Sequence, residues 1–96
     1  MVYTLVCHML VKPEFVQDAI AHLKESTEVY SKDIGTIHWL TMQDVHDPCK
    51  FTIVERFEQE SSQEHHLANP FWATWNPKVE PWLVKPIEVL RHEELA

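Results

Sequence analysis

The segment Glu55–Trp75 concentrates the side chains of this sequence that could take part in chemistry. It contains one glutamate on a predicted strand, Glu55, the adjacent histidines His65 and His66, and two tryptophans. A histidine can act as a general base near neutral pH, and aromatic rings can hold a planar ligand. Together these residue types predict a ligand cleft that uses acid–base chemistry.

The histidines and cysteines do not form a metal-binding pattern. No H-E-x-x-H or C-x-x-C spacing occurs, and the neighbouring His65 and His66 would point about 100° apart on a helix. Cys7 and Cys49 can form at most one bridge, which is too few for a small secreted disulfide scaffold. We therefore expect reduced thiols and no bound metal.

Composition restricts the fold and the partners. The 96 residues, 45% of them apolar, predict one globular domain over residues 1–96. A formal charge of −7 disfavours nucleic acid and anionic membranes as partners. The apolar run Tyr3–Val11 is far shorter than the roughly 20 residues of a membrane span and lacks the features of a signal peptide. We expect a soluble cytoplasmic protein.

Hydrophobic periodicity predicts the order strand, helix, strand, strand, helices, strand. The expected elements are a strand over 3–11, a helix over 13–30, strands over 36–45 and 51–57, short helices from residue 61, and a strand over 87–91. This order is the α+β, ferredoxin-like βαββαβ pattern with a four-stranded antiparallel sheet and helices on one face. The other face is also apolar, so we expect the sheet of a second copy to cover it in a symmetric homodimer.

Two polar residues lie within predicted strands. Alternation places Glu55 on the same face as Phe51, Ile53 and Phe57. A buried carboxylate without a partner would cost several kcal/mol or take up a proton, so Glu55 should have a specific hydrogen-bonding or cationic partner. His8, inside the first strand, is interpreted as a hydrogen-bonded core residue, with a catalytic role as the alternative.

The second helical region should begin at a capping box formed by Ser61 and Glu64. Leu67 is expected to face the core because it is the only large apolar side chain nearby. That orientation would place His66 at the edge of the core and His65 toward solvent. His66 is therefore the candidate for chemistry.

Proline pairs divide the rest of this region. Asn69-Pro70 and Asn76-Pro77 both fit helix starts, which predicts a series of short helical pieces. Phe71 and Trp75, four residues apart, are expected to anchor their piece on the sheet. Trp72 would lie on the flank, where it is either packed or lining a cavity.

The predicted long helix ends with a tyrosine and is followed by a glycine. Tyr30 completes the apolar stripe of the helix and is interpreted as a core residue, with cleft lining as the alternative. Gly35 is the only glycine, and it is expected to turn the backbone at a positive φ before the next strand.

These residues resemble a known family over roughly Thr4–Arg91. The strand glutamate Glu55 followed by Phe57, and then the segment His66–Phe71, are similar to the strand and the H-l-x-s-P-h-F helix segment of antibiotic biosynthesis monooxygenase (ABM) domains. Gly35 also fits this pattern. The resemblance implies a dimeric α+β barrel, in which the sheets of two copies pack together.

The resemblance also implies an active-site cleft between the helices and the sheet. Relatives of the oxygenase type need no metal or flavin, because a phenol or anthrone substrate is deprotonated and its anion reduces oxygen directly. In this chain His66 would be the base, and Glu55 or His8 would orient a phenolic oxygen or accept a proton. Trp72 would cover the ring of the substrate, and Tyr30, under its alternative interpretation as a cleft residue, would contact the same substrate.

Two other functions are compatible with the same fold. An isomerase or lyase would use His66 with Glu55 or His8 as an acid–base pair without oxygen. A non-catalytic stress-response dimer that binds small ligands is the third possibility.

The chain departs from the family pattern next to Gly35. Many family members have a cysteine after this glycine, where this chain has Thr36.

Overall fold

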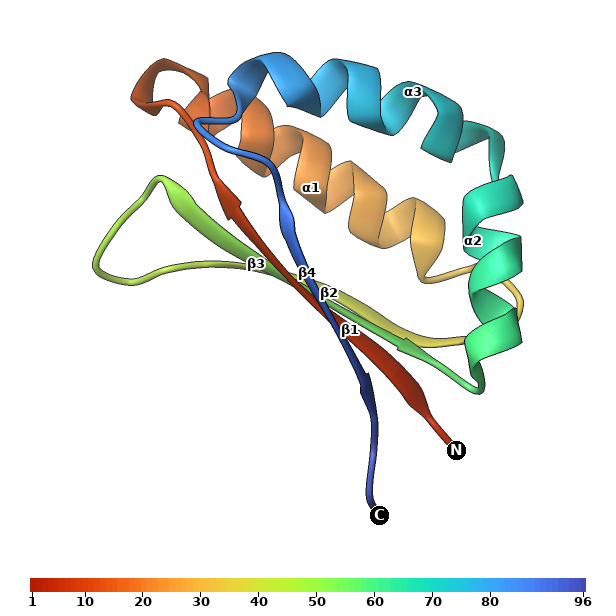
Figure 1. The fold of residues 1–96 in the computed structure, drawn as a ribbon. Coiled ribbons are helices and arrows are strands. Elements are labelled where there is room, and N and C mark those ends of the chain that lie inside the picture. Colours follow the sequence, from red (N-terminus) through yellow and green to blue (C-terminus); the bar gives the residue numbers. More distant parts are fainter.

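A computed structural model describes residues 1–96 and contains one four-stranded sheet and three α-helices (Figure 1). The elements are β1 (Tyr3–Leu10), α1 (Val16–Tyr30), β2 (Thr36–Gln43), β3 (Lys50–Phe57), α2 (Gln63–Ala68), α3 (Pro70–Val79) and β4 (Glu88–Glu93). The strand order is β2-β3-β1-β4, and every pair is antiparallel. This confirms the ferredoxin-like βαββαβ prediction. No helix is both long and apolar enough to cross a membrane.

One face of the sheet carries the core. The helices lie over this inner face (Figure 1), and alternate residues of β1 and β3 point into it because successive strand side chains point to opposite faces. The buried strand residues on this face are Tyr3, Leu5, Cys7, Met9, Trp39, Phe51, Ile53, Glu55 and Phe57. The face predicted for Glu55 is therefore confirmed.

The outer face of the sheet lies open in the single chain. Register places Val6 between Val54 and Leu90, and Leu40 is opposite Val54, so four apolar side chains form one row across it. His8 is on this face: it is exposed, and its Nδ1 lies 3.2 Å from the Thr52 hydroxyl oxygen. His8 is therefore not a core residue of the single chain, contrary to the prediction, because no element of the chain covers the outer face.

Helix α1 buries two polar residues that its apolar stripe did not predict. His22 and Ser26 are both buried, next to Ala19 and Leu23. The Ser26 hydroxyl donates to the carbonyl oxygen of His22 (2.7 Å) and accepts from the indole N–H of Trp75 (2.9 Å). This contact joins α1 to α3.

The start of the α2 region differs from the sequence prediction. The chain enters α2 through a 3₁₀ turn, Glu60–Ser62, and no side chain caps it. Leu67 is 46% exposed and His66 only 3%, so the expected orientation of these two residues was wrong. The apolar environment favours a neutral imidazole that can pack among aromatic rings, whereas Leu67 lies at the rim.

Helix α3 begins where predicted but continues further. The Asn69 side chain accepts from the Phe71 amide (3.0 Å), which confirms the cap. Pro77 lies inside the helix and does not start a new one. Proline at this position removes the amide that would bond to the carbonyl of Ala73. Ala73 is exposed, so water can satisfy that carbonyl.

The strand ends also differ from the prediction. Strand β2 ends at Gln43, because the Asp44 carboxylate accepts from the amides of His46 (2.9 Å) and Asp47 (2.8 Å) and turns the chain. Those two amides lower the pKa of Asp44. Strand β4 extends to Glu93, into the polar tail that periodicity did not predict.

Gly35 occupies a tight turn between α1 and β2. Its φ is +83°, as predicted, and an added Cβ would lie 2.7 Å from both Cβ and Oγ of Ser62. We expect Gly35→Ala to lower the free energy of unfolding by roughly 1–3 kcal/mol, because it combines a left-handed backbone with a steric clash. Urea denaturation would measure the change.

The variant Ser62→Gly provides the control. It removes the atoms that the new Cβ would meet, so Gly35→Ala should cost less in the Ser62→Gly background than in the wild type. Equal costs in the two backgrounds would show that the clash does not contribute.

Candidate active site

A cleft of about 360 Å³ lies between the inner face of the sheet and helices α2 and α3. Cys7, Ile53 and Val89 contribute to its floor, and His66 and Trp72 contribute to its wall. Eight of its 13 lining residues are hydrophobic. The resemblance to ABM domains predicted a cleft in this position.

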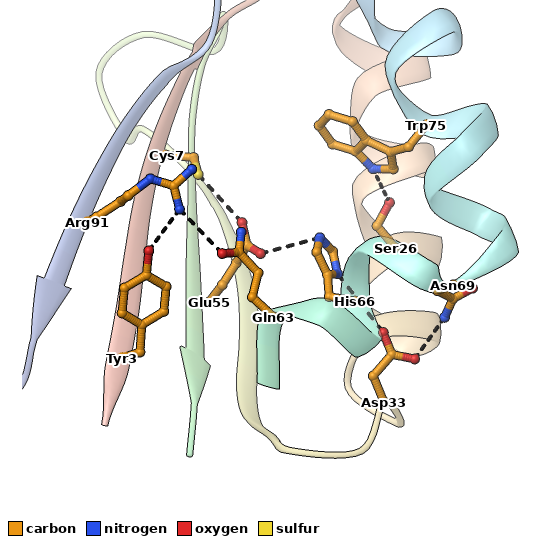
Figure 2. A network of polar contacts seen from close by, with 10 residues as sticks. All are labelled: Tyr3, Cys7, Ser26, Asp33, Glu55, Gln63, His66, Asn69, Trp75 and Arg91. Carbon is orange, nitrogen blue, oxygen red and sulfur yellow. Dashed lines mark hydrogen bonds and ion pairs between the residues drawn. The ribbon is translucent and has the colours of Figure 1, made fainter. Parts of the chain in front are cut away.

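Glu55 lies on the floor of the cleft and is 6% exposed. The Cys7 thiol donates to its Oε2 at 3.5 Å (Figure 2). Burial raises the pKa of Glu55, while the Trp39 indole N–H, the Cys7 thiol and the positive charge of Arg91 oppose this shift. Burial also raises the pKa of Cys7 to about 12, so the thiol stays protonated and acts as a donor. Glu55 therefore has the partner that the sequence required.

His66 lies between two carboxyl groups. Its Nε2 is 3.5 Å from Oε1 of Glu55, and its Nδ1 is 4.0 Å from Oδ2 of Asp33 (Figure 2). Burial lowers the pKa of His66 to about 4, so the ring is neutral near pH 7. The folded pKa is below that of the unfolded chain. His66 therefore stabilises the fold above about pH 6.5, and this contribution is lost as the pH falls toward 4.

Aromatic rings enclose His66. Tyr30 packs edge-on at a centroid distance of 4.1 Å, Trp72 lies at 5.3 Å and Trp39 at 6.1 Å. These rings exclude water from the imidazole, which explains the lowered pKa. They also hold the ring in one orientation.

Asp33 was not identified from the sequence. It follows the C-terminus of α1 and accepts from Nδ2 of Asn69 at 2.8 Å. An acidic residue at this position opposes the helix dipole, which favours basic side chains there. This unfavourable placement is the feature of the sequence that could have identified Asp33 as a functional residue.

The structure brings together some of the predicted site residues and separates others. Glu55, His66 and Trp72 all line the cleft. Tyr30 is fully buried behind His66 and does not line it, which agrees with the core interpretation and not with a substrate-binding role. His8 is on the outer face of the sheet and cannot reach the cleft.

Further residues of the cleft were not identified from the sequence. Trp75 lines it and stacks on Trp72, with centroids 6.0 Å apart, while its indole N–H bonds to Ser26. Gln63 and Arg91 also line it. The cleft therefore combines stacked indoles, a neutral imidazole beside a carboxyl group, and one guanidinium.

Comparisons with known proteins agree with this architecture. The family model described as "Antibiotic biosynthesis monooxygenase" matches residues 2–78. No curated protein matches the chain in sequence.

Solved structures match over nearly the whole chain. A structure from Nitrosomonas europaea, named after the same family, has a TM-score of 0.93 at 18% identity and covers 98% of this chain and 99% of its own. Rv0793 from Mycobacterium tuberculosis has a TM-score of 0.92 at 14% identity and covers 100% and 97%. A conserved protein from Methanosarcina mazei has a TM-score of 0.88 at 25% identity and covers 98% and 93%. These likenesses show a shared fold.

The burial of His66 leads to a spectroscopic prediction. We expect its ring to remain neutral at about pH 5.5, where an ordinary histidine is mostly protonated. The proton should lie on Nδ1, facing Asp33, which leaves the Nε2 lone pair toward Glu55. Long-range ¹H–¹⁵N spectra of the imidazole would measure both the charge and the tautomer.

The control for this experiment is Asp33→Asn. It keeps an oxygen that can accept from Asn69 but replaces the carboxylate that faces Nδ1. We expect the Nδ1–H tautomer to become less populated in this variant. An imidazolium signal from wild-type His66 at about pH 5.5 would contradict the assignment.

Proposed function

Because the chain belongs to the antibiotic biosynthesis monooxygenase family, we propose that it is a cofactor-independent monooxygenase that acts on a small phenol or anthrone. The observation that carries this proposal is a neutral His66 between two carboxyl groups at the wall of an aromatic cleft. The cleft volume of about 360 Å³ suits a small ligand, since such pockets span roughly 300–1,000 Å³.

His66 and Glu55 form the base. Burial lowers the pKa of His66 to about 4 and raises that of Glu55 above its ordinary value, so the carboxylate binds a proton more readily than the imidazole does. In the unprotonated pair, Nε2 of His66 takes the substrate proton, and the 3.5 Å contact allows the proton to pass to Oε1 of Glu55, which has the higher proton affinity. Asp33 stabilises the imidazolium from the other side.

The oxygen step then depends on the substrate anion. Deprotonation makes the ring electron-rich, and it reduces O₂ without a further electron donor. An anthrone loses two hydrogens from its methylene carbon and gains one oxygen atom there. The second oxygen atom leaves with those hydrogens as water. The stacked Trp72 and Trp75 support the ring and keep bulk water away from the anion.

An isomerase or lyase is the second candidate. The Glu55–His66 pair is the observation that favours it, because an acid and a base 3.5 Å apart can move a proton between two substrate atoms without oxygen. Oxygen consumption coupled to turnover distinguishes the two reactions.

We also propose that the protein acts as a homodimer. Val6, Leu40, Val54 and Leu90 form the apolar row on the outer face. Leu40 and Leu90 are 45% and 41% exposed in the single chain. A second copy of the same sheet can cover this row under two-fold symmetry.

The variant His66→Ala tests the catalytic base. We expect kcat for oxidation of an anthrone or hydroquinone substrate to fall by about 10²–10⁴, since this is the usual contribution of a general base. An oxygen electrode together with product absorbance would measure the rate. His65→Ala is the matched control, because that neighbouring ring is exposed and should leave the rate unchanged.

Two results would contradict this assignment. Unchanged turnover by a folded His66→Ala protein would remove His66 from the mechanism. Turnover of a substrate without oxygen consumption would replace the monooxygenase with the isomerase or lyase.

The variant Val54→Asp tests the dimer. A charge at the centre of the apolar row should convert the dimer to a monomer, because burying an unpaired carboxylate costs several kcal/mol. Analytical ultracentrifugation would measure the mass. Val45→Asp is the control, since Val45 is 90% exposed in the β2–β3 connection. A dimeric Val54→Asp protein would argue against this interface.

A further inference from the structure

Arg91 is the only lysine or arginine that lines the cleft. It lies on β4, and strand register places it beside Leu5 and, one strand further, Glu55. Neighbouring strands are about 4.8 Å apart, so the backbones of Arg91 and Glu55 are separated by roughly 10 Å across the floor. Arg91 and the Glu55–His66 pair therefore line the same cleft from different elements.

The chain holds this guanidinium in place from one side only. Nη1 of Arg91 donates to the Tyr3 hydroxyl (2.8 Å) and to Oε1 of Gln63 (3.3 Å) (Figure 2). Its Nε and Nη2 make no hydrogen bond within the chain, and no carboxylate forms an ion pair with it. One edge of a positioned guanidinium therefore remains available.

Arg56, on β3 of the same sheet, has a partner for each of its three guanidinium nitrogens. Its Nε and Nη2 bond to the two carboxylate oxygens of Glu94 (2.7 and 2.8 Å), and its Nη1 contacts His38. In a protein with a formal charge of −7, a carboxylate partner for Arg91 would be easy to supply. Arg91 is exposed and has no such partner, so its Nε and Nη2 are free to bind a ligand group in the cleft.

We propose that Arg91 binds the carboxylate of an aromatic ligand, so that the cleft selects planar aromatic carboxylates over their neutral analogues. The inference rests on the proposed function, because it assigns a further group of the same substrate. A two-ring carboxylate can place its acid group at Arg91 and its opposite edge toward His66 and Glu55. The free Nε and Nη2 edge matches a carboxylate in a bidentate arrangement.

Binding of naphthalene-2-carboxylate and naphthalene-2-carboxamide to the full chain tests this selectivity. The two compounds have nearly the same shape, but only the first is an anion near neutral pH. We expect the carboxylate to bind roughly 10- to 100-fold more tightly, because hydrogen bonds to charged groups are the stronger ones. Isothermal titration calorimetry would measure both affinities, with quenching of the tryptophans that line the cleft as a second readout.

Two substitutions of Arg91 assign the effect to its guanidinium. Arg91→Gln should bind the carboxylate no better than the carboxamide, while its carboxamide affinity stays near that of the wild type. Arg91→Lys should keep only part of the preference, because an ammonium lacks the planar fork. Lys78→Gln is the matched control, since it removes one positive charge from an exposed position of α3 outside the cleft. It should retain the full preference.

The outcomes separate this inference from the proposed function. Equal affinities of wild type for both compounds, or an unchanged preference in folded Arg91→Gln, would overturn the role of Arg91 and leave the aromatic cleft intact. Failure of both compounds to bind would contradict the cleft as an aromatic site and with it both proposals.

Discussion

The contact between Glu55 and His66 is the constraint on which the site depends. Two ionisable groups are removed from water, and each could be charged only at a cost of several kcal/mol. The chain reduces this cost by keeping His66 neutral and by giving Glu55 the Cys7 thiol as a donor. The same arrangement suits proton transfer, because the neutral imidazole and the carboxyl group lie 3.5 Å apart and a proton can pass between them.

The turn that follows α1 extends this constraint to the fold. Asp33 faces one side of the His66 ring and accepts from Asn69, which caps α3. Two residues later, Gly35 has no Cβ, and Ser62 at the start of α2 packs into the space. One short turn therefore positions α2 and α3 against the sheet. The orientation of the imidazole depends on this backbone as much as on its aromatic neighbours.

The sequence correctly predicted the features of the fold that the periodicity of apolar residues determines. Alternation along β3 correctly placed Glu55 among buried side chains, and the spacing of apolar residues correctly predicted α1 and the βαββαβ order. It could not orient α2, because a helix of six residues has too few apolar positions to define a face. His66 and Leu67 were therefore assigned to the wrong environments, and Asp33, which meets His66 only through the tertiary fold, was missed.

The same alternation connects the outer face to the cleft. Val54 and Glu55 are neighbours on β3, as are Leu90 and Arg91 on β4, and in each pair one side chain points to each face. A slip of one residue would exchange them, placing Leu90 in the cleft and Arg91 outside.

Strand β4 is an edge strand that pairs only with β1. Its register is supported from the tail, where Glu94 bonds to Thr4 (2.6 Å) and to Arg56. A second copy packed on the apolar row would fix the same register from outside. Assembly and ligand recognition would then depend on one set of strand pairings, although they use opposite faces of the sheet.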